Sequence, residues 1–302
     1  PPVVIGPVIM VIGLSLAPVA VHMASGRAGD GSVVLVPYNT AILIAMASLV
    51  VTIVAAVWAK GIFRLIPIMF GVVTGYVLSA FAGIVDYNPI LDAPWLTVPN
   101  FVAPEFGWSA ILFMIPVAIA PAIEHIGDIL AIGNVTGRNY LQKPGLHRTL
   151  LGDGIATSSA ALLGGPPNTT YSEVTGAVML TRNFNPRIMI WAALIAIVLA
   201  FVGKFGAALQ SIPVPVMGGI LCLLFGSIAV VGLNTLIRHQ VDLSEARNLV
   251  IVGVTLVFGI GGMVLGHMEG IALCAVVAIA LNLILPGDRE AWGKAIYEHQ
   301  TD

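Results

Sequence analysis

Long apolar runs with few charged residues follow one another along nearly the whole chain of 302 residues. Hydrophobic residues make up 58% of the sequence and charged residues only 9%, whereas roughly a quarter of the residues in a soluble protein are charged. So few charges could not cover the surface of a soluble protein. We therefore expect an all-α polytopic membrane protein, because helices satisfy their own backbone hydrogen bonds in lipid.

A membrane-spanning helix needs about 20 mostly apolar residues. Eight runs are predicted to be spans: Val3–Ser25, Thr40–Ala59, Leu65–Val85, Ser109–Gly133, Met189–Ala208, Val214–Ile237, Leu249–Gly266 and Ile271–Leu285. The stretch Gly145–Arg182 is long enough for two further crossings, although polar residues, glycines and prolines interrupt it. The sequence therefore predicts ten crossings if both of these segments cross.

The distribution of basic residues supports ten crossings and predicts an orientation. With Pro1 inside, only Arg27 and Lys204 of the 13 Lys and Arg residues fall outside, as the positive-inside rule requires. The loop Asp86–Trp108 carries acids but no Lys or Arg, which fits the outer face. A single crossing within Gly145–Arg182 would turn every later basic loop outward. We therefore expect two crossings there and a cytoplasmic tail over residues 287–302.

Two acids lie within one predicted span, in the stretch "PAIEHIGDILAIG". Glu124 and Asp128 are four residues apart, so a helix places both carboxylates on one face. Because like charges repel, one of the two pKa values should rise, which suits proton-coupled transport. The alternative is a structural role, in which the acids cap or pair with a polar neighbour. The neighbouring His125 is predicted to be a packed or hydrogen-bonded histidine on a different face.

The stretch "GGPPNTT" (residues 164–170) breaks an apolar segment. Glycine permits unusual backbone angles, and proline disfavours helix at the residue before it. The pattern turns helical again from Tyr171, and Thr170-x-x-Glu173 matches a capping box. Glu173 is therefore either a cap that complements the helix dipole or a ligand at a membrane-depth helix start, where transporters place substrate sites. Asp153, in "GDG", is predicted to be a turn or cap residue.

Other chemistries find no support in the sequence. There is no nucleotide-binding loop, no Ser/His/Asp cluster, no metal-ligand set and no basic cluster for nucleic acid. Cys222 and Cys274 lie in apolar runs and are predicted to be small core residues. We therefore expect a protein that is not an enzyme and that uses neither a metal nor an organic cofactor.

Four ordered motifs resemble the nucleobase–ascorbate transporter family (nucleobase:cation symporter-2), and especially its bacterial uracil–xanthine permeases. They are "EHIGD" (124–128), "KPGLHRTLLGDGIATS" (143–158), "GGPPNTTYSEVTGAVMLTR" (164–182) and "IPVPVMGG" (212–219). The resemblance implies a transporter of fourteen segments in two inverted repeats of seven, with a core and a gate domain. It also implies a short strand near Gly164–Thr170 that precedes a half-helix.

The resemblance divides the chain into parts that correspond to segments five to fourteen. Residues 1–108 resemble the first part of the gate domain, 109–208 the second half of the core and 209–286 the second part of the gate. Residues 287–302 form the tail, and we expect the first half of the core to lie outside this sequence. Because gate domains of the family often dimerise, the resemblance also implies a homodimer.

The family's substrate positions map onto Glu124, Asp128 and Glu173. Backbone amides near Tyr171 and Ser172, left free by the break, could donate to a carbonyl group of a nucleobase. Glu124 and Asp128 are also the expected proton-coupling groups. Two positions depart from the pattern, since the uracil branch has His where this chain has Asp128 and the family signature has Asn where it has Val174.

The function that these residues imply is uracil:proton symport across the cell inner membrane or plasma membrane, with alternating access of core against gate. Asp128 favours a second reading within the family, a xanthine or uric acid permease. A sulfate-permease-type anion exchanger is a remote alternative, since Glu173 and the short tail both argue against it. A purely structural membrane protein would leave the three acids without a purpose.

Overall fold

The computed structural model describes residues 1–171, 173–265 and 268–287, which are mainly helical. A short 3-10 helix at Gly61–Leu65 and a π-helical turn at Leu141–Gly145 join longer elements. The remaining elements are α1 (Pro2–Ser15), α2 (Ala17–Ala24), α3 (Tyr38–Trp58), α4 (Pro67–Phe81), α5 (Asn88–Asp92), α6 (Trp108–Val117), α7 (Ile119–Thr136), α8 (Leu146–Leu162), α9 (Glu173–Thr181), α10 (Arg187–Ala200), α11 (Gly203–Gln210), α12 (Val214–Arg238), α13 (Ala246–Ile260), β1 (Val264–Leu265), β2 (Met268–Glu269) and α14 (Gly270–Ile284).

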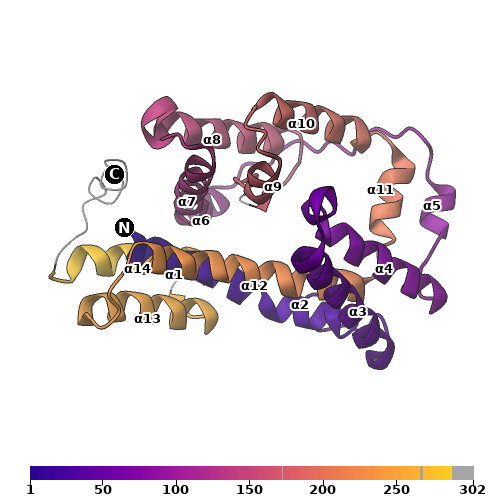
Figure 1. The fold of residues 1–302 in the computed structure, drawn as a ribbon, viewed down its shortest axis with the longest axis horizontal. Coiled ribbons are helices and arrows are strands. Elements are labelled where there is room, and N and C mark those ends of the chain that lie inside the picture. Colours follow the sequence, from indigo (N-terminus) through magenta and orange to yellow (C-terminus); the bar gives the residue numbers. More distant parts are fainter. Residues whose placement is uncertain (172, 266–267, 288–302) are drawn as a thin grey trace.

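The helices form two groups that face each other (Figure 1). One group holds α1, α2, α3, α12, α13 and α14, and the other holds α6 to α10, with α5 and α11 at one end. The long helix α12 packs against α1, α2, α3 and α4, while α14 contacts α6 and α7. Helix α7 therefore lies where the two groups meet.

Three segments of the described chain are long and apolar enough to cross a membrane: Pro2–Ala24, Tyr38–Trp58 and Val214–Arg238. Four shorter apolar helices of 10–17 residues accompany them: Pro67–Phe81, Arg187–Ala200, Ala246–Ile260 and Gly270–Ile284. A chain with so many apolar helices is a multi-pass membrane protein.

Prolines divide two of the predicted spans. The span predicted at Val3–Ser25 is confirmed as the apolar segment Pro2–Ala24, although its helix is interrupted at Leu16, two residues before Pro18. The span predicted at Ser109–Gly133 is interrupted at Ala118, just before Pro121. Proline lacks an N–H group and its ring clashes with the carbonyl group four residues earlier, so the helix restarts at each of these points.

Two other predicted spans also differ from the structure. The span Met189–Ala208 is divided between α10 and α11, because Val202 leaves the helix to form an antiparallel bridge with Leu96. The span Leu249–Gly266 ends at Ile260, just before two glycines, and the chain then forms the antiparallel pair β1–β2. The β-strands of the described chain lie there. The short strand predicted near Gly164–Thr170 is wrong, since these residues form a turn and irregular chain.

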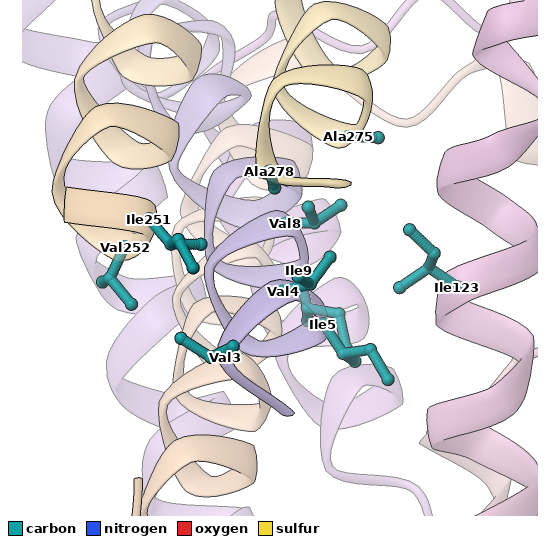
Figure 2. Packing of buried hydrophobic residues seen from close by; sticks show 10 residues of the cluster. All are labelled: Val3, Val4, Ile5, Val8, Ile9, Ile123, Ile251, Val252, Ala275 and Ala278. Carbon is teal, nitrogen blue, oxygen red and sulfur yellow. The ribbon is translucent and has the colours of Figure 1, made fainter. Parts of the chain in front are cut away.

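The main hydrophobic cluster joins α1, α7, α13 and α14, and Figure 2 shows its side chains. Its buried members are Val3, Val4, Ile5, Val8, Ile9, Ile123, Ile251, Val252, Ala275 and Ala278. Ile123 is the member from α7 and faces α1 across the gap between the ribbons (Figure 2). Each large aliphatic side chain contributes about 1.5–3 kcal/mol when buried from water, although less is gained where the alternative is lipid.

Glycines of α12 let neighbouring backbones approach closely. A Cβ atom on Gly218 would collide with the backbone of Ala24, and one on Gly219 with the backbone of Ala45. A Cβ atom on Gly232 would lie 2.6 Å from the Met10 nitrogen. Small residues commonly allow such close helix packing in membranes, so α12 needs glycine at these three positions.

A basic side chain connects the segment α5 to α11 at one end of the molecule. The Lys204 ammonium donates hydrogen bonds to the carbonyl oxygens of Ile90 and Leu91, at 2.9 and 3.2 Å. It also lies 5.6 Å from the ring centre of Trp95. The cation thus satisfies carbonyls near the end of α5 and contacts an aromatic face at once.

Candidate functional site

The two acids of α7 lie on a helix that is partly buried. The Asp128 side chain is buried, whereas Glu124 is half-buried. His125 is also buried, and it lies three residues before Asp128, which places the two on neighbouring positions of one helix surface. The prediction that His125 is a packed or hydrogen-bonded residue is confirmed, but its face is not separate from that of Asp128.

The predicted break in the apolar segment is present between α8 and α9. Helix α8 ends at Leu162, and Gly164 follows with a φ of +80°, a backbone angle that favours glycine. The backbone of Val102 approaches Gly164 so closely that a Cβ atom there would lie 2.7 Å from its carbonyl oxygen. Tyr171, where helix is predicted to resume, is still irregular, and Glu173 lies within α9.

Side chains of the two preceding helices hold the irregular stretch. From α8, the Thr157 hydroxyl donates a 2.8 Å hydrogen bond to the carbonyl oxygen of Asn168. From α7, Nδ1 of His125 lies 2.5 Å from Oγ1 of Thr170. Helix α7 also contacts both α8 and α9. On the α8 side, Nδ2 of Asn168 also donates to the carbonyl oxygen of Ala156, at 3.4 Å. The break is therefore hydrogen-bonded to both helices.

Asp153 lies inside α8, although the sequence predicts a turn or cap at this position. The glycines on either side of it adopt helical geometry, since flanking helical turns override their weak propensity. Its carboxylate is close enough to interact electrostatically with His125. Helix α8 thus adds a third acid to the neighbourhood of α7.

The structure describes the side chains of some predicted site residues but not of others. Glu124 and Asp128 lie on α7, which contacts α9, the helix that begins at Glu173. Tyr171 lies just before this helix and its side chain is exposed. Ser172 and the side chain of Glu173 lie outside the described residues, so their predicted contact with substrate stays a prediction.

Cys274 is buried and Cys222 is half-buried, and both are free thiols, which matches the prediction of small core residues. Across the chain apart from 172, 266–267 and 288–302, no three His, Cys, Asp or Glu side chains are grouped to hold a metal ion.

Sequence reasoning missed the partners that hold the break. His125 and Thr170 are 45 residues apart, and Thr157 and Asn168 are 11 apart across a non-helical turn. No periodicity connects such positions. The only available signal was that a histidine adjoins the Glu124/Asp128 pair and that polar residues follow the two prolines.

Comparison with known proteins places the chain among transporters. Residues 1–268 match the xanthine/uracil permease model, which is described as a permease family. The "Probable uracil permease" of Pasteurella multocida is 61% identical over 290 residues, covering 95% of this chain and 68% of that protein. The "Probable uracil permease" of Haemophilus influenzae is 58% identical, with coverage of 95% and 69%. The "Uracil permease" of Bacillus caldolyticus is 46% identical, with coverage of 100% and 71%.

The family match covers most of the chain, and relatives such as those of Pasteurella multocida and Bacillus caldolyticus are 61% and 46% identical to it. The motifs around Glu124 and Glu173 both fall inside the matched residues. The chain therefore belongs to the xanthine–uracil permease family of nucleobase:cation symporters.

Proposed function

We propose that this chain belongs to an importer of uracil that is coupled to the proton gradient. The observation that carries the proposal is that relatives named uracil permeases share 39–61% of their residues with nearly the whole chain. The pairing of a broken membrane segment with acids on the adjacent helix supports it, because uracil presents N–H donors that carboxylates accept. The proposed location is the cell inner membrane, with the C-terminus in the cytoplasm.

The proposed mechanism is alternating access between two bodies. Residues 109–208 would form half of a core that carries the site, and residues 1–108 and 209–286 would form the gate, in a 7+7 arrangement of fourteen segments. The two groups of helices support this division, because α6 to α10 form a group distinct from the one around α12 and meet that group through α6 and α7 (Figure 1). Pairing of two gates would give the homodimer.

At the site, we propose that Glu173 and Glu124 accept hydrogen bonds from the ring N–H groups of uracil. Backbone amides near Tyr171 and Ser172 would donate to a ring carbonyl, since the first amides of a helix have no intrahelical partner. Asp128 and Glu124 would carry the coupled proton. Hydrogen bonds to charged groups contribute about 1.5–3 kcal/mol each and neutral ones about 0.5–1.5 kcal/mol, so two carboxylate contacts and one amide contact would make binding selective.

The test is uptake of labelled uracil by cells that lack their own uracil permease and express the complete gene. The variant Glu173→Gln keeps the size of the side chain but can no longer accept two charged hydrogen bonds, so uptake should fall at least tenfold. The matched control is Glu105→Gln, since Glu105 is an exposed acid distant in sequence from the motifs. If the Glu173→Gln variant takes up uracil as well as the wild type does, the site assignment is ruled out.

A second substrate class deserves a direct comparison because of Asp128. In the resemblance described above, an acid at this position is typical of the purine branch. An excess of unlabelled xanthine or uric acid should leave uracil uptake unchanged if the protein is a uracil permease. Strong competition by either purine, with weak uptake of uracil itself, would instead assign the protein to the purine branch.

A further inference from the structure

We propose that His125 is a positioning residue, which fixes the start of α9 by its hydrogen bond to Thr170. The proposal rests on the proposed function, because it assigns a role within the same site. It concerns a side chain that contacts the irregular stretch directly and lies beside the two acids without being one of the predicted ligands.

The irregular stretch cannot hold itself in place. Residues 165–171 have no helical or strand ladder, and backbone groups at membrane depth need partners within the protein. Thr170 is half-buried, whereas its neighbours Thr169 and Tyr171 are exposed. Thr170 is thus the point at which this end of the stretch meets the rest of the protein.

The distance along the chain makes Thr170 an effective anchor. It precedes Glu173, the first residue of α9, by three residues. Three residues span at most about 10 Å even when fully extended. A fixed Thr170 therefore restricts where α9 begins, and with it the direction of the free amides and of the Glu173 backbone.

Helix α7 is a suitable reference for this anchor because packing holds it. Ile123 lies two residues before His125 and is buried in the cluster with α1, α13 and α14 (Figure 2). The His125 ring itself is 4% exposed, so its rotamer is confined by its neighbours. Precise sites depend on such supporting side chains, whose own geometry is fixed by packing.

The bond also restricts the tautomer of the His125 ring. If the Thr170 hydroxyl donates to Nδ1, the proton of a neutral ring resides on Nε2, and the reverse holds if Nδ1 donates. Nε2 is buried and makes no hydrogen bond within the described residues. The contact with Thr170 is therefore the hydrogen bond through which His125 acts on the break.

The Thr157–Asn168 bond complements this anchor from the other side. It holds the stretch two residues before Thr170 and comes from α8 rather than α7. Two anchors from two helices fix both position and direction, whereas one anchor alone would leave the stretch free to pivot. Thr170 is the nearer anchor to α9, so its loss should affect substrate binding more than loss of the Thr157 contact.

The experiment measures uracil uptake kinetics in the full-length protein. Thr170→Val removes the hydroxyl at nearly constant volume, and Thr170→Ser retains it. His125→Phe removes both ring nitrogens, and His125→Asn retains a polar atom near the position of Nδ1. The matched control is Thr136→Val, because the Thr136 hydroxyl bonds only carbonyl oxygens of its own helix α7.

We expect Thr170→Val to raise the KM for uracil by roughly three- to tenfold, the range of one hydrogen bond. Vmax per transporter molecule should stay within about twofold of wild type, and Thr170→Ser should restore the KM. His125→Phe should give a similar KM, and the double variant should be no worse than either single variant, because both remove the same interaction. His125→Asn should recover at least part of the affinity.

Three results would overturn the proposal. The first is an unchanged KM in Thr170→Val, with any loss of uptake matched by loss of folded protein. The second is strict additivity in the double variant. The third is a raised KM or lost uptake in both His125 variants while Thr170→Val keeps the wild-type KM. Absence of uracil uptake by the wild type would instead refute the proposed function, so the two failures are distinguishable.

Discussion

At the scale of single residues, the buried acid on α7 is the group on which the proposed energy coupling depends. Asp128 is 7% exposed, and its neighbour Glu124 lies one helical turn away. A carboxylate in such a place is held in its charged form only by partners, and it otherwise binds a proton. An acid that changes its protonation between the two sides of the membrane would couple uptake to the proton gradient.

Asp128→Asn should separate binding from coupling. The amide still forms hydrogen bonds but cannot carry the proton, so accumulation of uracil against its gradient should be lost, with a fall of at least tenfold. Exchange of external for internal uracil should continue, since exchange needs no net proton movement. The measurement compares accumulation in energised vesicles with exchange in de-energised vesicles. Equal loss of both activities would argue for a binding role alone.

For single residues, the sequence predicts some features of the site and not others. The isolation of Glu124 and Asp128 within an apolar run makes them predictable as candidate site residues, because charged residues are costly in a membrane. The bond between His125 and Thr170 could not be predicted, because it depends on how a non-helical segment returns to α7. The carboxylate position of Glu173 also depends on that path.

At the scale of elements, uninterrupted apolar runs were the most predictable. The predicted span Val214–Ile237 agrees with α12 to within one residue at the C-terminal end, and Thr40–Ala59 lies close to α3. The break was predictable because Gly and Pro act on the local backbone. The divisions near Pro18 and Pro121 were missed because composition alone does not show whether a proline bends or interrupts a helix. The β1–β2 pair follows two glycines and has too few residues for a periodic pattern.

Helix α12 offers a matched test of packing within one element. Gly232→Ala should destabilise the protein, because its Cβ atom would lie within 2.7 Å of both the backbone and the side chain of Met10; overpacking of this kind costs about 1–3 kcal/mol. Gly226→Ala should be neutral or stabilising, since nothing lies within 4 Å of its Cβ position and alanine favours helix by about 1 kcal/mol.

Thermal unfolding of the purified protein in detergent measures this difference. The midpoint should fall for Gly232→Ala and stay constant or rise for Gly226→Ala. A lower midpoint in both variants would mean that the close contact between α12 and α1 is not the reason that Gly232→Ala destabilises the protein.

For the whole molecule, the distribution of charge predicts which side of the membrane each loop faces. The two basic residues predicted outside differ in their surroundings. Arg27 is exposed in the loop between α2 and α3, whereas Lys204 is half-buried and bonded to the carbonyls near the end of α5. Exposed loops are the preferred sites of proteolytic cleavage, and Lys204 is not at such a site, because it lies in α11 and its ammonium is hydrogen-bonded.

Trypsin added to intact spheroplasts should therefore cut after Arg27 and leave Lys204 intact. Inverted vesicles should instead be cut at the basic loops around Arg138 and Arg238. Mass spectrometry of the fragments identifies the sites, and cleavage after Arg138 from outside would reverse the proposed orientation. If the proposed orientation holds, the bonded ammonium of Lys204 would leave Arg27 as the exposed basic residue on the outer face of this chain, so that one cut would report the orientation.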